Sequence, residues 1–231
     1  MGSDSDRRPA SWALVGDDAA MFYEPKDGHG LPHNPFNAIV LPRPIGWIST
    51  LDEAGRTNLA PFSFFNAVSY VPPQVMFATT GPHAAGGHKD SVRNALATGE
   101  FVANLATWEL REAVNLTSTP APSHVDELEL AGLTAIPSRL VAPPRVAESP
   151  VHLECRVVTS LELPTPDPED PNTVVFGEVV GIHIADDAIV DGLVDVGRLR
   201  PIGRLGYREY VHVRDSFELT RPGWPVEPAA S

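Results

Sequence analysis

The sequence predicts a mainly β protein, an antiparallel barrel into which a few helices are inserted. Three observations support this fold class. The chain of 231 residues contains 24 prolines and 18 glycines, so short segments joined by stiff turns are expected rather than a long helical bundle. Apolar residues alternate along several segments, as half-buried strands require. Strands and helices do not alternate regularly, which disfavours a doubly wound parallel sheet.

Three strands are expected after a polar N-terminal segment. The segment 44–51 is predicted to be the first strand, and 52–56 the turn that follows, with Gly55 available for a positive φ. A second strand is expected over 58–68 and a third over 74–79.

The clearest helix is expected to begin near Asp90 or Ser91, either of which can cap it. Its apolar positions follow helical spacing at Val92, Ala95, Leu96 and Gly99. The elements expected after it are a strand over 101–105, a short helix from about Trp108, a helix over about 124–131, strands over 151–163 and 173–185, and a last strand near 208–213. Period 2 places Val174, Phe176, Val180, Ile182 and Ile184 on one face of the second long strand.

Composition excludes several classes of protein. Lys plus Arg is 17 and Asp plus Glu is 30, so the formal net charge is 17 − 30 = −13, which argues against a nucleic-acid partner. No apolar run reaches about 18 residues, so no membrane span is predicted. The start of the chain has no secretory signal, and Cys155 is the single cysteine, so a reducing, cytoplasmic location is expected.

Motif searches predict no catalytic side chain and no metal site. HExxH and Cys/His zinc spacings are absent, as are GxSxG, GxGxxG and P-loop patterns. Cys155 lies within an apolar strand, a poor context for a nucleophile.

A pattern of hydroxyl, aromatic and cationic residues suggests a ligand with two ends. Lys89, Asp90 and Ser91 open the expected helix, whose N-terminus is a seat for phosphate. The Phe-rich segment 62–65 could flank a flat conjugated ring. Ordinary helix capping and core packing explain the same residues, so the pattern by itself leaves both interpretations open.

Several motifs in the same order resemble the flavin reductase-like FMN-binding family, the split-barrel flavoproteins that include flavoredoxin. These motifs are RPIGWIST (43–50), NLAPFSFFN (58–66), HKDSVRN (88–94), GEFVAN (99–104), DELELAGL (126–133), ESPVHLEC (148–155), FGEVV (176–180) and GRLGY (203–207). The last motif departs from the family pattern, because Tyr207 stands where a second glycine or small residue is common. The resemblance covers one domain, about 36–213, between an N-terminal arm (1–35) and a C-terminal tail (214–231).

The resemblance implies a six-stranded antiparallel split barrel that works as a homodimer, with FMN in a groove near the subunit interface. Carried over by position, the expected phosphate-side ligands are Ser49, Thr50, Lys89 and Ser91. The expected flavin-ring side is formed by Trp47, Phe62, Ser63, Phe64 and Asn66, and Asn94 is expected to orient the first turn of the helix. The loops 81–88 and 120–126 are expected to border a pocket for a second substrate, with His124 more simply explained as a surface residue.

Three functions remain open at this level. The first is an NAD(P)H-dependent flavin reductase, with a hydride passing from nicotinamide to flavin and reduced flavin or electrons passing to a partner such as an oxygenase. The second is a flavoredoxin-like electron-transfer protein that holds FMN tightly, and the third is a flavin-binding module without turnover. Because the chain is strongly acidic, the groove must be locally positive, and the cations expected there are Lys89, Arg43, Arg93 and Arg204.

Overall fold

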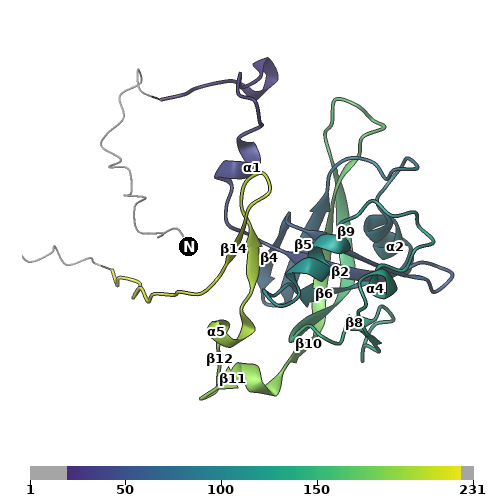
Figure 1. Cartoon of the computed structure of the whole chain (residues 1–231), viewed down its shortest axis with the longest axis vertical. Helices are drawn as coiled ribbons and strands as arrows, with labels where there is room; N and C mark the ends of the chain where they lie inside the picture. The colour runs from purple at the N-terminus through teal and green to yellow at the C-terminus, as the bar shows by residue number, and fades with distance from the viewer. Residues whose placement is uncertain (1–19, 225–231) are drawn as a thin grey trace, which may run out of the picture.

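The main sheet of the protein is antiparallel and has seven strands, as the computed structural model of residues 20–224 shows (Figure 1). Residues 1–19 of the expected arm and 225–231 of the expected tail lie outside the described residues. The sheet order is β3-β2-β6-β9-β10-β5-β4. Its strands are β2 (Gly46–Leu51), β3 (Thr57–Phe62), β4 (Phe65–Tyr70), β5 (Pro73–Thr79), β6 (Glu100–Leu105), β9 (Val151–Leu163) and β10 (Asn172–Ile184). The mainly β split-barrel class is therefore confirmed.

Smaller elements surround this sheet. The helices are η2 (Pro25–Asp27), α1 (Phe36–Ile39), α2 (Asp90–Thr98), α3 (Arg111–Leu116), α4 (Glu127–Leu130), η3 (Asp186–Ala188) and α5 (Val196–Leu199). A three-stranded sheet contains β1 (Arg43–Pro44), β13 (Ile202–Arg204) and β14 (Tyr210–His212). Two two-stranded sheets pair β7 (Ala135–Ile136) with β8 (Arg145–Val146) and β11 (Ile189–Val190) with β12 (Leu193–Val194). None of the helices within residues 20–224 has the length and hydropathy needed to cross a bilayer.

The expected count of six strands is corrected to seven, because one expected strand is two. The segment expected as a single strand over 58–68 bends at Ser63 and Phe64, which separate β3 from β4. The two halves then lie at opposite ends of the sheet order. Continuous apolar character along this segment hides the bend from a sequence pattern. The β13 strand was not expected either, although β14, which is equally short, was.

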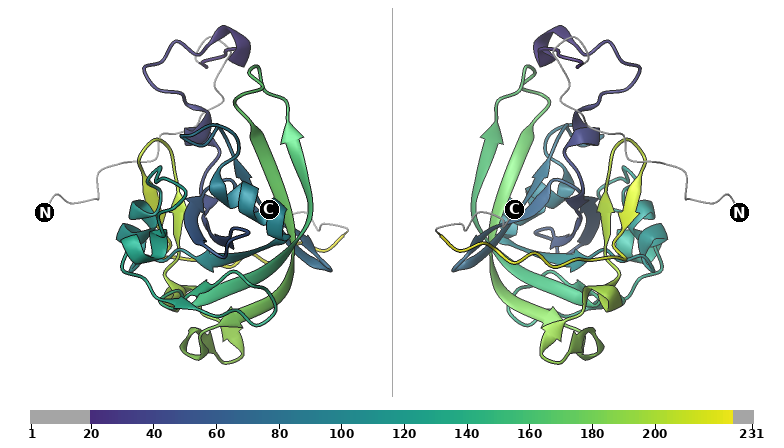
Figure 2. Two further views of the ribbon diagram at one scale, coloured as in Figure 1. Left: turned by 90° about the vertical axis from the view of Figure 1, so that its right-hand side faces the viewer. Right: turned by 90° about the vertical axis from the view of Figure 1, so that its left-hand side faces the viewer.

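The long hairpin of β9 and β10 matches its expected bounds closely and extends beyond the body of the barrel (Figure 2). The core face of β10 carries Thr173, Val175, Gly177 and Val179, whereas the expected apolar face is the less buried one. Both faces of this strand are apolar, so alternation cannot select the buried face. Position 177 on the core face requires glycine, because a Cβ there would lie 2.5 Å from the ring of Phe101.

Two apolar clusters form the core. One gathers Phe77, Phe101 and Val175 under α2, and the other gathers Trp47 and Leu59 under α3 and α4. Lys89 rather than Asp90 or Ser91 is the N-cap residue of α2, and no side chain caps this helix. As a result, the first turn of α2 is left open to other partners.

Candidate functional site

A polar cavity of about 190 Å³ lies at the start of α2. We call it the α2 cavity. Its lining includes Asn58, Phe62, His83, Lys89, Asp90, Ser91, Thr117 and Glu127. The Lys89 ammonium donates one hydrogen bond to the carbonyl of Pro82 (3.0 Å), which leaves two of its donors free. The backbone N–H groups of Asp90 and Ser91 make no hydrogen bond to another described residue, as is normal for a first helical turn. The cavity therefore presents cationic and N–H donors to an anion.

Asn58 is the centre of the hydrogen-bond network behind this cavity. Its side-chain amide donates to Glu127 Oε2 (3.1 Å), which fixes the carbonyl end of the amide toward α2. That carbonyl oxygen accepts from the hydroxyls of Ser91 (2.8 Å) and Thr50 (3.4 Å). Asn94 donates to Thr50 (3.3 Å). The network joins β2, β3, α2 and α4, so the cavity wall is held by four elements of one chain.

Some expected phosphate ligands lie in the layer behind the cavity. Ser49 and Thr50 are fully buried, and the Ser49 hydroxyl donates to the carbonyl of Pro144 (2.6 Å). Asn94 is also buried, in the network just described. Trp47 is fully buried as well, and its indole N–H donates to Thr117 (2.9 Å), a residue of the cavity wall. The structure thus gives Trp47 a supporting position. Lys89 and Ser91 line the cavity, but Ser91 is only 1% exposed and its hydroxyl donates to Asn58.

Two carboxylates also line the α2 cavity. Asp90 is compensated, because it pairs with Arg93, accepts from Ser123 (2.9 Å) and lies 3.6 Å from His83 Nε2. Glu127 has no cationic partner among the described residues. Burial raises the pKa of its carboxyl, against the opposing effect of the hydrogen bonds from Leu59 N–H and Asn58. Glu127 is therefore the least compensated negative charge at this cavity.

The remaining expected residues line a separate, larger groove of about 790 Å³. We call it the apolar groove. Ser63, Phe64 and Asn66 lie on its wall. Its other main lining residues are Arg43, Val68, Met76, Leu161, Leu163, Val174 and Phe176. The outer face of the β9–β10 hairpin is one of its walls. The less buried face of β10 therefore lines the groove.

The α2 cavity and the apolar groove meet at the connection between β3 and β4. Phe62 lines the α2 cavity, and the next two residues, Ser63 and Phe64, line the apolar groove. A small cavity of about 140 Å³ lies between them, because it shares Pro61 and Ser118 with the former and Ser63 with the latter. The bend that divides the expected strand therefore brings the two ends of the site together.

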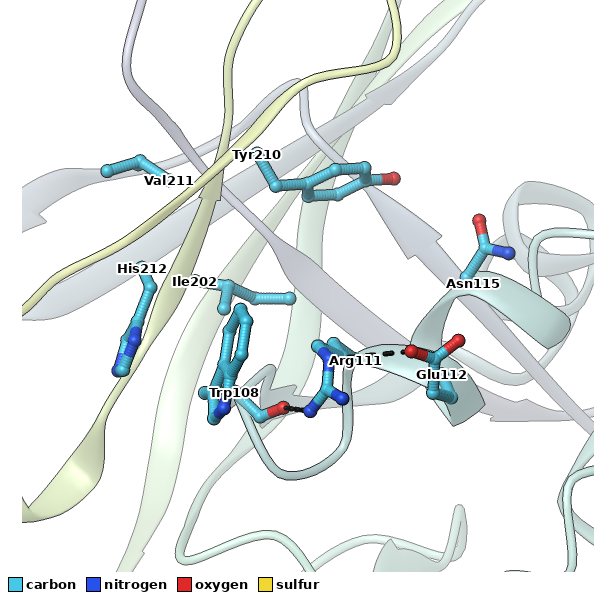
Figure 3. A pocket seen from close by; sticks show the side chains of 8 residues that line it. All are labelled: Trp108, Arg111, Glu112, Asn115, Ile202, Tyr210, Val211 and His212. Atoms are coloured by element: carbon cyan, nitrogen blue, oxygen red, sulfur yellow. Dashed lines mark hydrogen bonds and ion pairs between the residues drawn. The ribbon is translucent and has the colours of Figure 1, made fainter. Parts of the chain in front are cut away.

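An aromatic cavity of about 200 Å³ lies apart from these residues, between α3 and β14. Figure 3 shows Trp108 between His212 and Arg111. The rings of Trp108 and His212 are stacked with centroids 4.9 Å apart, and the Arg111 guanidinium lies 4.2 Å from the Trp108 ring centroid. The faces of Trp108 are thus already covered by the protein, and none of the expected site residues lies here.

Some residues that line the α2 cavity were not predicted from the sequence. Asn58 was quoted in a motif but given no role, and Glu127 occurs in another motif, also without a role. His83 lies in a loop expected to border the second-substrate pocket, yet it lines the α2 cavity with Lys89. His124 is exposed and is not among the residues lining that cavity. No sequence signal links Asn58 to Glu127, because they are far apart in the chain.

A split antiparallel barrel in which a polar cavity with a lysine and free helix N–H groups lies next to an aromatic-lined groove defines a class of protein suited to a ligand with an anionic end and a flat end. Comparisons with known proteins identify the family. Residues 39–203 match the family model described as flavin reductase like domain. A protein of Halalkalibacterium halodurans is 40% identical over 183 residues, which is 79% of this chain and 87% of that relative.

Two solved structures are similar over most of the chain. Nitrilotriacetate monooxygenase component B from Bacillus cereus has a TM-score of 0.74 and 30% identity, covering 82% of this chain and 98% of that one. The 2-nitrobenzoate 2-nitroreductase NbaA of Pseudomonas fluorescens has a TM-score of 0.71 and 28% identity, covering 84% of this chain and 92% of that one. The chain belongs to the flavin reductase like domain family, a flavin-related oxidoreductase family.

Proposed function

We propose that this protein is an NAD(P)H-dependent flavin reductase that binds FMN across the α2 cavity and the apolar groove. The observation that carries the proposal is the meeting of these two sites at Phe62, Ser63 and Phe64. Hydrogen-bond donors suited to an anion and an aromatic wall thus lie on the two sides of the β3–β4 connection, which supports one ligand reaching across both. Family membership supports the flavin, and FMN in particular is favoured because the α2 cavity is suited to a terminal phosphate.

The residues present fit such a ligand. Lys89 and the free N–H groups of Asp90 and Ser91 would hold the phosphate, with the Lys89 contact the stronger because it is charge-assisted. Phe62, Ser63, Phe64 and Asn66 would border the flavin ring. Thr50, Ser49, Asn94 and Trp47 would act from behind, by holding the wall rather than by touching the ligand.

The chemistry is supplied by the coenzymes. FMN held by Lys89 and the first turn of α2 would supply the redox chemistry, in which a hydride (two electrons and one proton) leaves nicotinamide C4 for flavin N5 and oxidises the nucleotide to NAD(P)⁺. The protein orients the two rings and excludes water, so this step needs no proton-transferring side chain. The reduced flavin or its electrons would pass to a partner. The name of the monooxygenase component supports an oxygenase, and that of the nitroreductase supports a small aromatic acceptor.

A homodimer completes the proposal. The apolar groove exposes large apolar side chains, including Val68, Leu161 and Leu163, which a second copy would cover. In this arrangement the flavin ring would lie near the subunit interface.

The test is spectroscopic. The purified protein is mixed with FMN and then given NADH or NADPH without air, and loss of the flavin absorbance is followed. We expect bleaching with at least one nucleotide. If neither nucleotide reduces bound FMN, the reductase is ruled out, and retention of a yellow colour through desalting would then favour the flavoredoxin-like alternative.

A further inference from the structure

A second polar cavity, of about 440 Å³, lies between the N-terminal segment, β1 and the β13–β14 connection. We call it the arginine cavity. Its wall includes His33, Asn37, Arg43, Ser63, Arg204 and Tyr207. It shares Arg43 and Ser63 with the apolar groove, so it opens next to the proposed flavin-ring site.

The charge of this cavity is unusual for so acidic a chain. Neither Arg43 nor Arg204 pairs with a carboxylate of the described residues, and no carboxylate lines the cavity. Arg43 is held by backbone carbonyls, those of Asn37 (2.7 Å), Val40 and Leu205 (3.1 Å). Burial and the nearby charge of Arg204 lower the pKa of Arg43. Two uncompensated cations in one cavity are stabilised when an anion binds between them.

The aromatic residue of this cavity is held under backbone strain. Tyr207 has φ 53°, in the left-handed region that glycine adopts without cost. Its side chain is half exposed, and the centroid of its ring lies 5.7 Å from that of His33. Little burial therefore offsets the strain. Strained residues of this kind concentrate at functional sites.

Close packing fixes the loop that carries Tyr207. A Cβ at the preceding Gly206 would lie 2.5 Å from the Cβ of Ala38 in α1, so the loop rests directly on the N-terminal segment. The Tyr207 carbonyl accepts a hydrogen bond from the Arg204 guanidinium, whose plane also lies over the Tyr210 ring at 4.6 Å. The Tyr207 ring and the Arg204 guanidinium therefore reach the cavity from one short stretch of chain.

We propose that the arginine cavity binds the phosphate-bearing part of the pyridine nucleotide that reduces the flavin, with Arg204 contacting phosphate and Tyr207 stacking on a base. This inference rests on the proposed reductase function. Guanidinium groups are suited to phosphate oxygens, and an exposed tyrosine ring gives a stacking surface at low entropic cost. This proposal replaces the expectation that the loops 81–88 and 120–126 border the second-substrate pocket. The pocket would instead lie at the opposite end of the β3–β4 connection.

The main test is Arg204→Gln, compared with Arg208→Gln as a control. Arg208 is an exposed arginine of the same connection and does not line the cavity. In Arg204→Gln we expect the KM for NADH or NADPH to rise about tenfold or more, with kcat changed less than twofold. The Kd of NADP⁺, measured by calorimetry on the FMN-loaded protein, should rise by a similar factor. FMN affinity should match that of the wild type, and the melting temperature should fall slightly, because the contacts of Arg204 with Tyr207 and Tyr210 are lost.

Tyr207→Gly gives a second, independent test. Glycine relieves the strain at this positive φ, so the variant should melt at the same temperature or higher. Its KM and the Kd of NADP⁺ should nevertheless rise severalfold, because the stacking ring is lost. A stability gain combined with weaker nucleotide binding is not expected of a merely structural tyrosine.

Three outcomes would overturn the assignment. The first is unchanged NADP⁺ affinity in both variants. The second is an equal loss in Arg208→Gln, which would indicate general electrostatic attraction. The third is weakened FMN binding or a shifted flavin potential in Arg204→Gln with normal NADP⁺ affinity, which would assign the cation to the flavin. Failure of wild-type protein to oxidise either nucleotide would instead remove the reductase function, and the NADP⁺ titration would still decide on the cavity.

Discussion

The α2 cavity and the apolar groove are neighbours on one barrel, but they are built in opposite ways. The cavity is closed by a network from Asn58 to Glu127, Ser91 and Thr50, all within a single chain. The groove is walled by exposed apolar side chains of the β9–β10 hairpin with no described residue covering them. Polar contacts therefore complete one end of the site in a monomer, whereas the other end is exposed and would be covered in the proposed homodimer. Binding of phosphate and binding of the ring should respond to different substitutions.

The largest effect is expected from a charge in the groove. Leu161→Glu places a carboxylate on a side chain that is 53% exposed in the single chain, so folding of the monomer should survive. In a dimer each copy would bury an unpaired charge, at a cost of about 3 kcal/mol or more. Sedimentation should show the dimer Kd weakened about 100-fold or more.

Val158→Glu is the matched control for this substitution. Val158 lies on the same strand and is 52% exposed, but it does not line the groove. The dimer should persist in this variant. A wild-type protein that sediments as a monomer at micromolar concentration would contradict the view that the groove is incomplete.

The next largest effect is expected from a substitution in the α2 cavity. Lys89→Ala removes the charge-assisted contact and should weaken FMN binding by about 1.5–3 kcal/mol, roughly tenfold to a hundredfold or more. Riboflavin, which lacks the phosphate, should bind both proteins alike in a fluorescence titration. Lys26→Ala, at an exposed lysine paired with Glu24, serves as the control. Equal FMN affinity in Lys89→Ala and wild type would show that the phosphate binds elsewhere.

A smaller change of opposite sign is expected at Glu127. Glu127→Gln keeps an acceptor for Asn58 and Leu59 N–H but removes the negative charge of the cavity wall that has no cationic partner among the described residues. FMN affinity should rise by about 1 kcal/mol, or roughly fivefold, at neutral pH. Because burial raises the pKa of this carboxyl, the wild type should approach the variant as the pH falls. Calorimetry at several pH values compares the two, and a constant difference would argue against a charge effect.

The smallest effect is expected outside both regions. His152 is buried in β9 with Nε2–H donating to the Val146 carbonyl (2.8 Å), and burial lowers its pKa below 6.5. A depressed pKa favours the neutral folded form, so its stabilising effect is present above pH 6.5 and is lost as the pH falls through the folded value. Thermal unfolding should lose on the order of 1 kcal/mol of stability in this range.

His152→Gln should flatten that part of the pH profile, because glutamine retains a donor for Val146 without titrating near neutral pH. FMN binding by this variant should match that of the wild type, since His152 lines neither region. An unaltered profile would instead assign the pH response to other groups.

Local patterns were sufficient for many elements. Helical spacing located α2, turn residues located the end of β2, and long alternation located β9 and β10 within one residue of their bounds. The family motifs located Lys89 and Ser91 on the cavity wall and Phe64 and Asn66 on the groove wall. These signals depend on residues close together in the chain, where spacing alone determines which side chains share a face.

The sequence by itself determined the fold class, the acidic charge and the start of α2 with its lysine. Only the tertiary structure decided that Ser49, Thr50 and Trp47 stand behind the wall, that Glu127 holds Asn58, and that Arg43 and Arg204 share a cavity without an acid. The physical reason is that burial and charge pairing depend on contacts between distant segments. A hydroxyl or a guanidinium has the same sequence signature whether it faces a ligand or the protein interior.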